Sequence, residues 1–335
     1  MSSQTFTAPV IPQPGVNQIP GQDLVSIRDL SPVEVDQLMH LSARVKSRPE
    51  EFRAVLAGKH VAMFFEKPSL RTRLTFEAGI SGLGGSISFV DQRQERLDAR
   101  ETLSDIAHNL ERWVSAIVLR TFAHETVEGM ADFARVPVVN ALSEVEHPCQ
   151  ALADYFTLYE RFGDLKKVTL AYVGDGNNVM HSLLLTAALL GSKIRIATPK
   201  GYGPSPQILA EALEIAKSTG ARIEIMTDPR KAVRGADAVY TDAWVSMGHE
   251  QETEERAKIF PPYQVNDKLM ACAPTHSVFM HCLPAHRNEE VTDSVIDSAS
   301  SIVFDQAENR MHVQKAILIM LVGGKARMPM RSVHA

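Results

Sequence analysis

The chain has 335 residues, of which 44% are hydrophobic and 22% are charged, and its formal net charge is −5 at pH 7. This length is sufficient for two packed domains, since a domain usually contains roughly 100–200 residues. The net acidity and the lack of a long basic run argue against a nucleic-acid partner. No apolar stretch approaches the roughly 18–20 residues of a membrane-spanning helix, so we expect no membrane partner.

The ends of the chain and its cysteines bear on location. The first 27 residues contain no Lys or Arg, whereas signal and transit peptides are positively charged. We expect residues 1–21 to form a flexible extension and residues 323–335 a tail. The three cysteines, Cys149, Cys272 and Cys282, form no CxxC pair, which favours a reducing compartment over disulfides or structural zinc. We therefore expect a cytoplasmic protein.

From residue 22 onward, short β-branched runs alternate with helical patterns, which predicts an α/β fold with parallel sheets. We place a first domain at residues 22–160 and a second at 161–322, with a hinge near Cys149–Leu165. In the first domain the pattern predicts strands at 60–65, 86–90, 115–119 and 136–140, and helices at about 31–46, 71–80, 101–111 and 124–134.

The second domain shows a clearer alternation of strands and helices. A helix over Asn178–Leu190 is expected to end at Gly191, and another to begin at Ser205 and Pro206 and to end at Gly220. A last helix at about 307–322 has an apolar stripe. The predicted strands are Val168–Val173, Ile194–Ala197, Ile223–Met226, Ala238–Thr241, Val278–His281 and Ile302–Phe304.

Ligands of open α/β sheets bind beyond the carboxyl ends of the strands, so residues that follow each strand are candidates for a site. After the strand that ends at Phe65, Ser69 is a natural N-cap for a helix whose free N–H groups favour an anion. Arg71 and Thr72 add donors there, and an arginine can bind two phosphate oxygens. The alternative is a capped helix with a surface arginine. Arg120 lies at the end of another predicted strand, and it is a stronger candidate for the phosphate site if its side chain points towards Arg71.

The segment His147-Pro148-Cys149-Gln150 begins a helix, because proline suits the first helical position. His147 and Gln150 then lie close enough to touch one ligand, and a neutral imidazole can donate to a carbonyl oxygen. An isolated His-Pro at a helix start is more often without a function.

A glycine-containing turn follows the strand at 168–173. It invites a dinucleotide-binding interpretation, but Val179 occupies the place of the third glycine in G-x-G-x-x-G. Asn177 and Asn178 offer amide groups to a small polar ligand instead.

Two further strand ends carry polar residues. Asp242 is suited to an ammonium group, and Ser246 with the backbone at Met247 to a carboxylate, although aspartate is also a common turn former. His281 and Cys282 have no second pair of metal ligands near them in the sequence, which disfavours a metal site.

The Leu283-Pro284 step that follows is typical of a constrained turn. Arg310, in the last predicted helix, is a further anion contact or a surface charge.

In this order, the segments resemble the aspartate/ornithine carbamoyltransferase family. The resemblance covers about residues 22–322 and rests on Ser-x-Arg-Thr-Arg at 69–73, His-Pro-x-Gln at 147–150, His-Cys-Leu-Pro at 281–284 and Glu-Asn-Arg at 308–310. The segment Asp-x-Trp-x-Ser-Met-Gly at 242–248 is similar to that of the members that act on ornithine. The resemblance implies two open parallel-sheet βα domains, with the C-terminal helix returning to the N-terminal domain.

The resemblance also implies an activity. The expected reaction moves the carbamoyl group of carbamoyl phosphate onto the side-chain amine of L-ornithine, without a metal or organic cofactor, in a homo-oligomer that is a trimer or a multiple of trimers. The implied catalytic residues are Arg71, Thr72, Arg120, His147 and Cys282. The implied ligands of carbamoyl phosphate are Ser69, Leu70, Arg71, Thr72, Arg120, His147, Pro148, Cys149, Gln150, Cys282, Leu283 and Arg310, and those of ornithine are Asn178, Asp242, Ser246 and Met247.

The sequence departs from the family in two places. Leu70 stands where Thr is frequent, which keeps a backbone N–H but lacks the hydroxyl. The loop Asp91–Glu101 has Arg96 and Asp98 where members commonly have Gln or His followed by glycine. In the family this loop reaches the carbamoyl phosphate of the neighbouring subunit.

Three alternatives remain at this stage. A sister enzyme would carbamoylate another amine, such as putrescine or an acylated ornithine, but the Ser-Met-Gly segment argues against it. A catalytically silent relative would bind metabolites or a protein. Arg71, His147 and Asp242 argue against it, but the altered loop at 91–101 leaves it open. A nucleotide binder is disfavoured by the missing glycine. The attacking amine has an ordinary pKa of about 10.4 and must become neutral, and either Asp242 or Cys282 is placed to assist.

Overall fold

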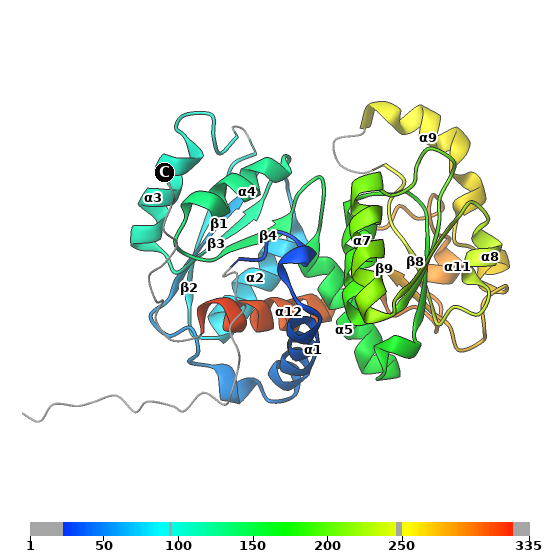
Figure 1. Cartoon of the computed structure of the whole chain (residues 1–335), viewed down its shortest axis with the longest axis horizontal. Coiled ribbons are helices and arrows are strands. Elements are labelled where there is room, and N and C mark those ends of the chain that lie inside the picture. Colours follow the sequence, from blue (N-terminus) through cyan, green and yellow to red (C-terminus); the bar gives the residue numbers. More distant parts are fainter. Residues whose placement is uncertain (1–22, 94–95, 246–249, 324–335) are drawn as a thin grey trace, which may run out of the picture.

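Each half of the chain folds around its own parallel sheet, and the two sheets form the cores of two lobes (Figure 1). The computed structural model describes residues 23–93, 96–245 and 250–323. The first sheet has the strand order β2-β1-β3-β4, and each neighbouring pair is parallel. Its strands are β1 (His60–Phe65), β2 (Ser86–Asp91), β3 (Ala116–Arg120) and β4 (Val138–Leu142).

The helices of the first lobe lie where the sequence pattern predicted them, to within two residues at each end. Ser31, Ser69 and Thr102 each cap a helix by accepting the backbone N–H three residues further on. These caps explain why the helices begin where they do. The elements are η1 (Ile27–Asp29), α1 (Pro32–Ser47), η2 (Pro49–Phe52), α2 (Leu70–Gly82), α3 (Leu103–Trp113) and α4 (His124–Phe133).

The second sheet has the order β7-β6-β5-β8-β9 and is again entirely parallel. Gly191 and Gly220 end α6 and α7 in the left-handed conformation, with φ of 68° and 82°, as predicted. The strands are β5 (Thr169–Val173), β6 (Lys193–Ala197), β7 (Arg222–Met226), β8 (Ala238–Thr241) and β9 (Val278–His281). The remaining elements are η3 (Leu165–Lys167), α6 (Asn178–Leu190), α7 (Pro206–Thr219), α8 (Pro229–Val233), η4 (Glu250–Glu252), α9 (Thr253–Ile259), η5 (Pro261–Tyr263), α10 (Asp267–Met270) and α11 (Asp293–Ile296).

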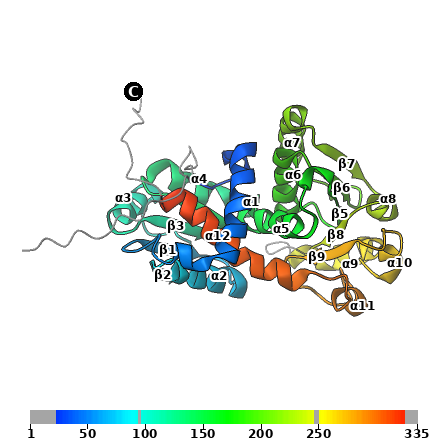
Figure 2. The same cartoon turned by 90° about the horizontal axis from the view of Figure 1, so that it is seen from below.

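Two long helices join the lobes, α5 (Pro148–Phe162) and α12 (Val303–Val322). α12 begins beside β9 and then packs along α5, α1 and α2, so the C-terminal helix returns to the first lobe (Figure 2). Tyr155, Phe156 and Ile317 at this seam are fully buried. One apolar cluster around α5 and α12 therefore spans both lobes, and each lobe has a further cluster of its own.

The strand predicted at Ile302–Phe304 is wrong, because the helix α12 begins there. Ser301 forms a single bridge with Phe279, so the chain follows β9 only briefly before it turns into the helix. Phe304 then points to solvent with 74% of its surface exposed, and Asp305 suits the positive end of the helix. A short β-branched run fits a strand or a helix start equally well.

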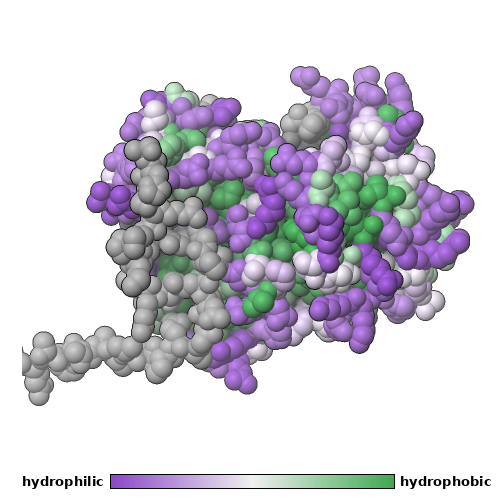
Figure 3. Space-filling view, viewed as in Figure 1, coloured by the Kyte–Doolittle hydropathy of each residue, from purple (hydrophilic) through white to green (hydrophobic). Residues whose placement is uncertain are grey.

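The strands that lead to the site are buried on both sides. Every residue of β3, β4, β5, β8 and β9 is buried, as parallel strands covered by helices on both faces require. On the face shown in Figure 3, hydrophilic side chains occupy most of the outline and apolar ones gather towards the middle. Among the described residues, no helix combines the length and apolarity needed to cross a membrane.

Candidate active site

The strand order reverses once in each sheet, and both reversals carry polar side chains. In the first sheet β2 and β3 lie on opposite sides of β1, so the loops after β1 and β3 flank a crevice. In the second sheet the loops after β5 and β8 do the same, because β6 and β8 flank β5. Ligands of open α/β sheets bind in such crevices. Both crevices contribute to one cavity of about 1120 Å³, which is lined by residues of both lobes.

The first crevice gathers positive charge. Ser69 Oγ accepts the N–H of Thr72 at 3.1 Å, and the first turn of α2 lines the cavity together with Arg71. Arg120, the last residue of β3, lines it from the neighbouring strand. Arg310 reaches it from α12 and donates from Nη2 to Thr72 Oγ1 at 2.6 Å. Three arginines at a helix N-terminus form a site suited to a phosphate group.

Burial opposes the charge of these arginines. Loss of solvation lowers the pKa of Arg71 and of Arg310, and it lowers the pKa of Arg120 to about 9 with a further contribution from the other two arginines. Nε of Arg120 and Nε of Arg310 are buried and have no hydrogen-bond partner in the described part of the chain. An unpaired buried donor costs about 1–3 kcal/mol. A bound dianion would satisfy these donors and offset the mutual repulsion.

Next to this charge lie an imidazole and an amide. His147 precedes α5, which begins with Pro148 as predicted. Burial, followed by the nearby Arg310 and Arg120, holds the pKa of His147 well below its ordinary value, so its ring is neutral at pH 7. His147 Nδ1 and Gln150 Oε1 are both buried without a partner among residues 23–93, 96–245 and 250–323. Together they are suited to a planar, uncharged group with C=O and N–H functions.

Glu146, which the sequence analysis did not propose, fixes the position of His147 and the start of α5. Its carboxylate accepts Ser182 Oγ–H at 3.0 Å, the N–H of Ile27 at 3.2 Å and the hydroxyl of Ser26. Ser182 Oγ in turn accepts the N–H of His147 at 2.9 Å. The start of α5 is thereby fixed to α6 and to the N-terminal segment. Burial raises the pKa of Glu146.

Asp242 dominates the second crevice. Its Oδ2 accepts Asn177 Nδ2–H at 2.7 Å, and its Oδ1 accepts the N–H of Ala243 at 2.8 Å. Asn177 also caps α6, which places the side chain between the turn after β5 and the end of β8. Asn178 lines the cavity and donates from Nδ2 to the Ser143 carbonyl at 2.6 Å. The arrangement presents a carboxylate and an amide to a ligand that carries an amine.

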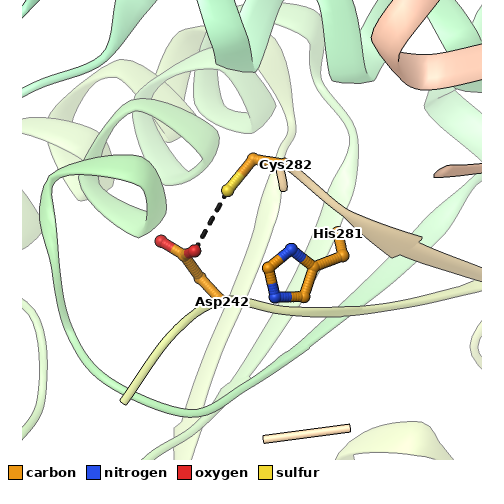
Figure 4. Close-up of side chains that lie close together, drawn as sticks. All are labelled: Asp242, His281 and Cys282. Carbon is orange, nitrogen blue, oxygen red and sulfur yellow. Dashed lines mark hydrogen bonds between the residues drawn. The ribbon is translucent and has the colours of Figure 1, made fainter. Parts of the chain in front are cut away.

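Cys282 and His281 lie beside this carboxylate (Figure 4). Cys282 Sγ donates to Asp242 Oδ1 at 3.0 Å. Burial and the adjacent Asp242 raise the pKa of Cys282 well above its ordinary value, so the thiol keeps its proton. Leu283 has a φ of 57° and is followed by a cis peptide bond to Pro284, which agrees with the constrained turn that the sequence predicted.

Asp242, His281 and Cys282 also bring one possible metal-ligand atom each to within 4.8 Å of the others. Both ring nitrogens of His281 are already engaged, however. Its Nδ1 accepts the N–H of Leu283 at 2.9 Å, and its Nε2 lies 3.0 Å from Glu290 Oε1. A ring nitrogen that accepts an N–H has no lone pair left for a cation. The geometry therefore favours His281 as the residue that holds the turn.

A buried ion pair fixes the far wall of the cavity. Arg256 Nη1 lies 2.8 Å from Asp175 Oδ2, and the two side chains are only 6% and 9% exposed. Arg256 also donates to the Trp244 carbonyl at 2.7 Å and to Glu252 at 2.8 Å, and it lies 5.0 Å from the centre of the Tyr202 ring. Arg256 thus joins α9 to the turn after β5 and to the end of β8. No pattern in the sequence pointed to it.

Most of the predicted site residues line the cavity: Ser69, Leu70, Arg71, Thr72, Arg120, His147, Gln150, Asn178, Asp242, Cys282, Leu283 and Arg310. Pro148 and Cys149 are buried in the first turn of α5 and are not part of the lining. Ser246 and Met247 lie outside the described residues. Lining residues that the sequence analysis did not propose include Lys67, Glu144, Tyr202, Glu255 and Arg256. Of these, only Lys67 had a signal, since it lies in the same loop as Ser69.

Comparison with known proteins covers both lobes. The family model described as aspartate/ornithine carbamoyltransferase, carbamoyl-P binding domain, matches residues 22–160, and the one described as its Asp/Orn binding domain matches residues 166–321. An ornithine carbamoyltransferase of Pyrococcus horikoshii is 47% identical over 311 residues, which are 92% of this chain and 98% of the relative. One of Hyperthermus butylicus is 50% identical over 306 residues, covering 90% and 98%.

Comparison with solved structures identifies the same group of proteins. The solved structure of ornithine carbamoyltransferase from Pyrococcus furiosus superimposes with a TM-score of 0.89 at 46% identity, over 93% of this chain and 100% of that one. The residues that the two family models match, 22–160 and 166–321, include both crevices. The chain therefore belongs to the aspartate/ornithine carbamoyltransferase family.

Proposed function

We propose that this chain transfers the carbamoyl group of carbamoyl phosphate to the side-chain amine of L-ornithine, which gives L-citrulline and phosphate in arginine metabolism. The observation that carries the proposal is that Arg71, Arg120 and Arg310 line one cavity together with Asp242. The three arginines are suited to a phosphate, and Asp242 is suited to an amine. The relatives named ornithine carbamoyltransferase, which match nine tenths of the chain, support ornithine as the acceptor.

The phosphate lies at the start of α2 in this proposal. The backbone N–H groups of Leu70 and Arg71, the hydroxyls of Ser69 and Thr72, and the side chains of Arg71 and Arg120 bind its oxygens, aided by the positive end of the helix. Leu70 contributes only its backbone, since 71% of its surface is exposed and it has no hydroxyl. Pro148 and Cys149 act through the first turn of α5, which they help to place.

The carbamoyl group lies between His147, Gln150 and Arg310, close to the backbone of Cys282 and Leu283. His147, Arg120 and Thr72 stabilise the negative charge that develops on the carbonyl oxygen when the amine attacks. The new C–N bond forms as the bond between the carbamoyl carbon and the phosphate oxygen breaks. The electron pair of the broken bond leaves with phosphate, which also accepts the proton that the attacking nitrogen loses. The arginines stabilise that leaving group.

Ornithine lies along the second crevice. Asp242 and Asn178 bind its amino-acid end, and Ser246 and Met247 complete this contact. The side-chain amine must lose a proton before it attacks, because its ordinary pKa is about 10.4. The protonated thiol of Cys282 donates to Asp242, so it orients the carboxylate and is not itself the proton acceptor.

Assembly and location belong to the same proposal. We expect a cytoplasmic homo-oligomer, a trimer or a multiple of trimers, without a nucleic-acid or membrane partner. Leu70 and Leu74 support an association through α2, since they are one helical turn apart and are 71% and 52% exposed. Light scattering on the purified protein tests this, and a particle with the mass of one chain contradicts it.

The direct test is a citrulline-forming assay with carbamoyl phosphate in which L-ornithine, putrescine, N-acetylornithine and L-aspartate are supplied in parallel. We expect turnover with ornithine alone. Turnover with another amine would preserve the phosphate site but overturn the assignment of the second crevice. A folded protein that turns over none of the four would overturn the enzymatic proposal.

A further inference from the structure

Asp154 is a fully buried carboxylate that does not touch the cavity, yet it accepts hydrogen bonds from three elements around it. Gln150 Nε2 of α5 and Gln306 Nε2 of α12 both donate to its Oδ1, each at 2.7 Å. Tyr240 of β8 donates its hydroxyl to Oδ2 at 2.9 Å. A buried carboxylate costs several kcal/mol unless its lone pairs are satisfied, and here three donors satisfy them.

The consequence concerns the direction of the Gln150 amide. An amide has one accepting end and one donating end, which are nearly identical in shape. Asp154 Oδ1 accepts hydrogen bonds, so it takes the NH2 end of Gln150 and leaves the carbonyl oxygen on the other side. Gln150 lines the cavity, and its Oε1 is a buried atom without a partner in the described part of the chain. The cavity therefore presents an acceptor at this point.

This direction does not depend on the charge of Asp154. Burial raises the pKa of Asp154 to about 7, so both protonation states occur near neutral pH. A proton on Oδ2 reverses only the bond to the Tyr240 hydroxyl, since a hydroxyl can donate or accept. Oδ1 remains an acceptor for Gln150 in either state.

We propose that Asp154 is a positioning residue that fixes the Gln150 amide with its carbonyl oxygen towards the substrate, and that the site thereby selects an acyl phosphate whose acyl group carries N–H donors. The inference rests on the proposed function, because it concerns the carbamoyl end of the same site. Carbamoyl phosphate has an NH2 group where acetyl phosphate has a methyl group of similar size. Only the former can satisfy Gln150 Oε1, and a buried acceptor left unpaired penalises the latter.

The experiment measures equilibrium binding of carbamoyl phosphate, acetyl phosphate and inorganic phosphate to the full chain by calorimetry. The variants are Asp154→Ala, Gln150→Ala and the double variant. We expect wild type to bind carbamoyl phosphate more tightly than acetyl phosphate. Asp154→Ala should reduce that preference by about tenfold, as the loss of one oriented hydrogen bond implies, and should leave the affinity for inorganic phosphate unchanged. The double variant should resemble Gln150→Ala, because both changes remove the same contact.

Two further variants separate positioning from general packing. Asp154→Asn keeps a carbonyl oxygen for the two glutamines and should retain the preference. Tyr240→Phe removes another hydrogen bond of the same carboxylate without touching Gln150, so it should lower the melting temperature and leave the preference intact.

Several outcomes would overturn the inference. One is that wild type binds the two acyl phosphates with equal affinity, and another is that Asp154→Ala loses affinity for all three ligands in parallel. The others are that the effects of the two single changes add in the double variant, or that Tyr240→Phe loses as much of the preference as Asp154→Ala does. Failure of the proposed function has a different signature. A wild type that prefers carbamoyl phosphate in calorimetry but forms no citrulline from ornithine would contradict the function and support the role of Asp154.

Discussion

Arg310 donates a hydrogen bond to the hydroxyl of Thr72 at 2.6 Å, which joins two buried residues that are 238 positions apart. Thr72 belongs to the first turn of α2, where the proposed phosphate binds, and Arg310 belongs to the helix that returns from the second lobe. The bond thus places a charged group of α12 beside the anion site. It also satisfies one donor of a guanidinium whose Nε has no partner in the described residues.

Replacement of Thr72 by Val should therefore weaken the site more than the loss of one contact suggests. The variant keeps the shape of the side chain but leaves Arg310 Nη2 buried without that acceptor, at a cost of about 1–3 kcal/mol. We expect kcat/KM for carbamoyl phosphate to fall by roughly ten- to a hundredfold. Thr72→Ser retains the hydroxyl and should recover most of the activity. Equal losses in the two variants would show that the methyl group matters instead.

Arg71 lines the cavity and is only half-buried, so its replacement should separate activity from stability. Arg71→Ala removes a cation from the leaving phosphate, and we expect kcat/KM to fall by about a thousandfold or more. The free energy of unfolding should change by only about 0.5 kcal/mol, since no core contact is lost. Arg112→Ala, in which an arginine with a side chain 74% exposed is removed from the same lobe, serves as control. Near-normal turnover of Arg71→Ala would remove Arg71 from the site.

Much of the fold follows from local patterns in the sequence. Short apolar runs such as Val278–Met280 predict strands buried on both faces, and Gly191 and Gly220 end helices at the residues where the structure ends them. Arg71 and Arg120 were found because they lie at or after the ends of predicted strands, and the strand order then places them on either side of one crevice. At these positions, interactions between residues that are close in sequence are sufficient to predict the structure.

The remaining features depend on contacts that are distant in sequence. Asp154 lies within an apolar helix and contacts Gln306, which is 152 positions away, so its role has no local signature. Arg256 lies on a short polar helix that resembles an ordinary surface element. At Ile302 the pattern was ambiguous, and the packing of α12 decided in favour of a helix. Such residues are recognised only when tertiary structure supplies their partners.

The Arg256–Asp175 pair should be important for stability because it is buried. Arg256→Gln removes the guanidinium that faces the buried carboxylate of Asp175, which we expect to lower the free energy of unfolding by roughly 3–5 kcal/mol. Arg287→Gln is a matched control, since Arg287 pairs with Asp293 and Asp297 while 45% of its side chain is exposed. That change should cost about 1 kcal/mol or less. Urea unfolding of both variants tests this prediction. Similar losses of unfolding free energy in the two variants would contradict the importance of burial.

Asp154 should also make the stability of the protein depend on pH. In the unfolded chain an aspartate has a pKa of about 3.9, whereas burial raises the pKa of Asp154 to about 7 in the native state. The native state therefore holds its proton more tightly. The stabilisation is complete below about pH 4, declines as the unfolded state ionises, and is lost above about pH 7, at roughly 1.4 kcal/mol per unit of pKa difference.

Asp154→Asn cannot ionise, so it isolates this contribution. His147, whose pKa burial lowers, changes stability in the opposite direction, but it does so equally in both proteins. We expect the free energy of unfolding of wild type, relative to Asp154→Asn, to decrease between about pH 4 and about pH 7 when both are unfolded in urea. A difference that stays constant over this range would mean that Asp154 ionises in the native state as readily as in the unfolded chain. The three hydrogen bonds to its carboxylate would then offset its burial completely.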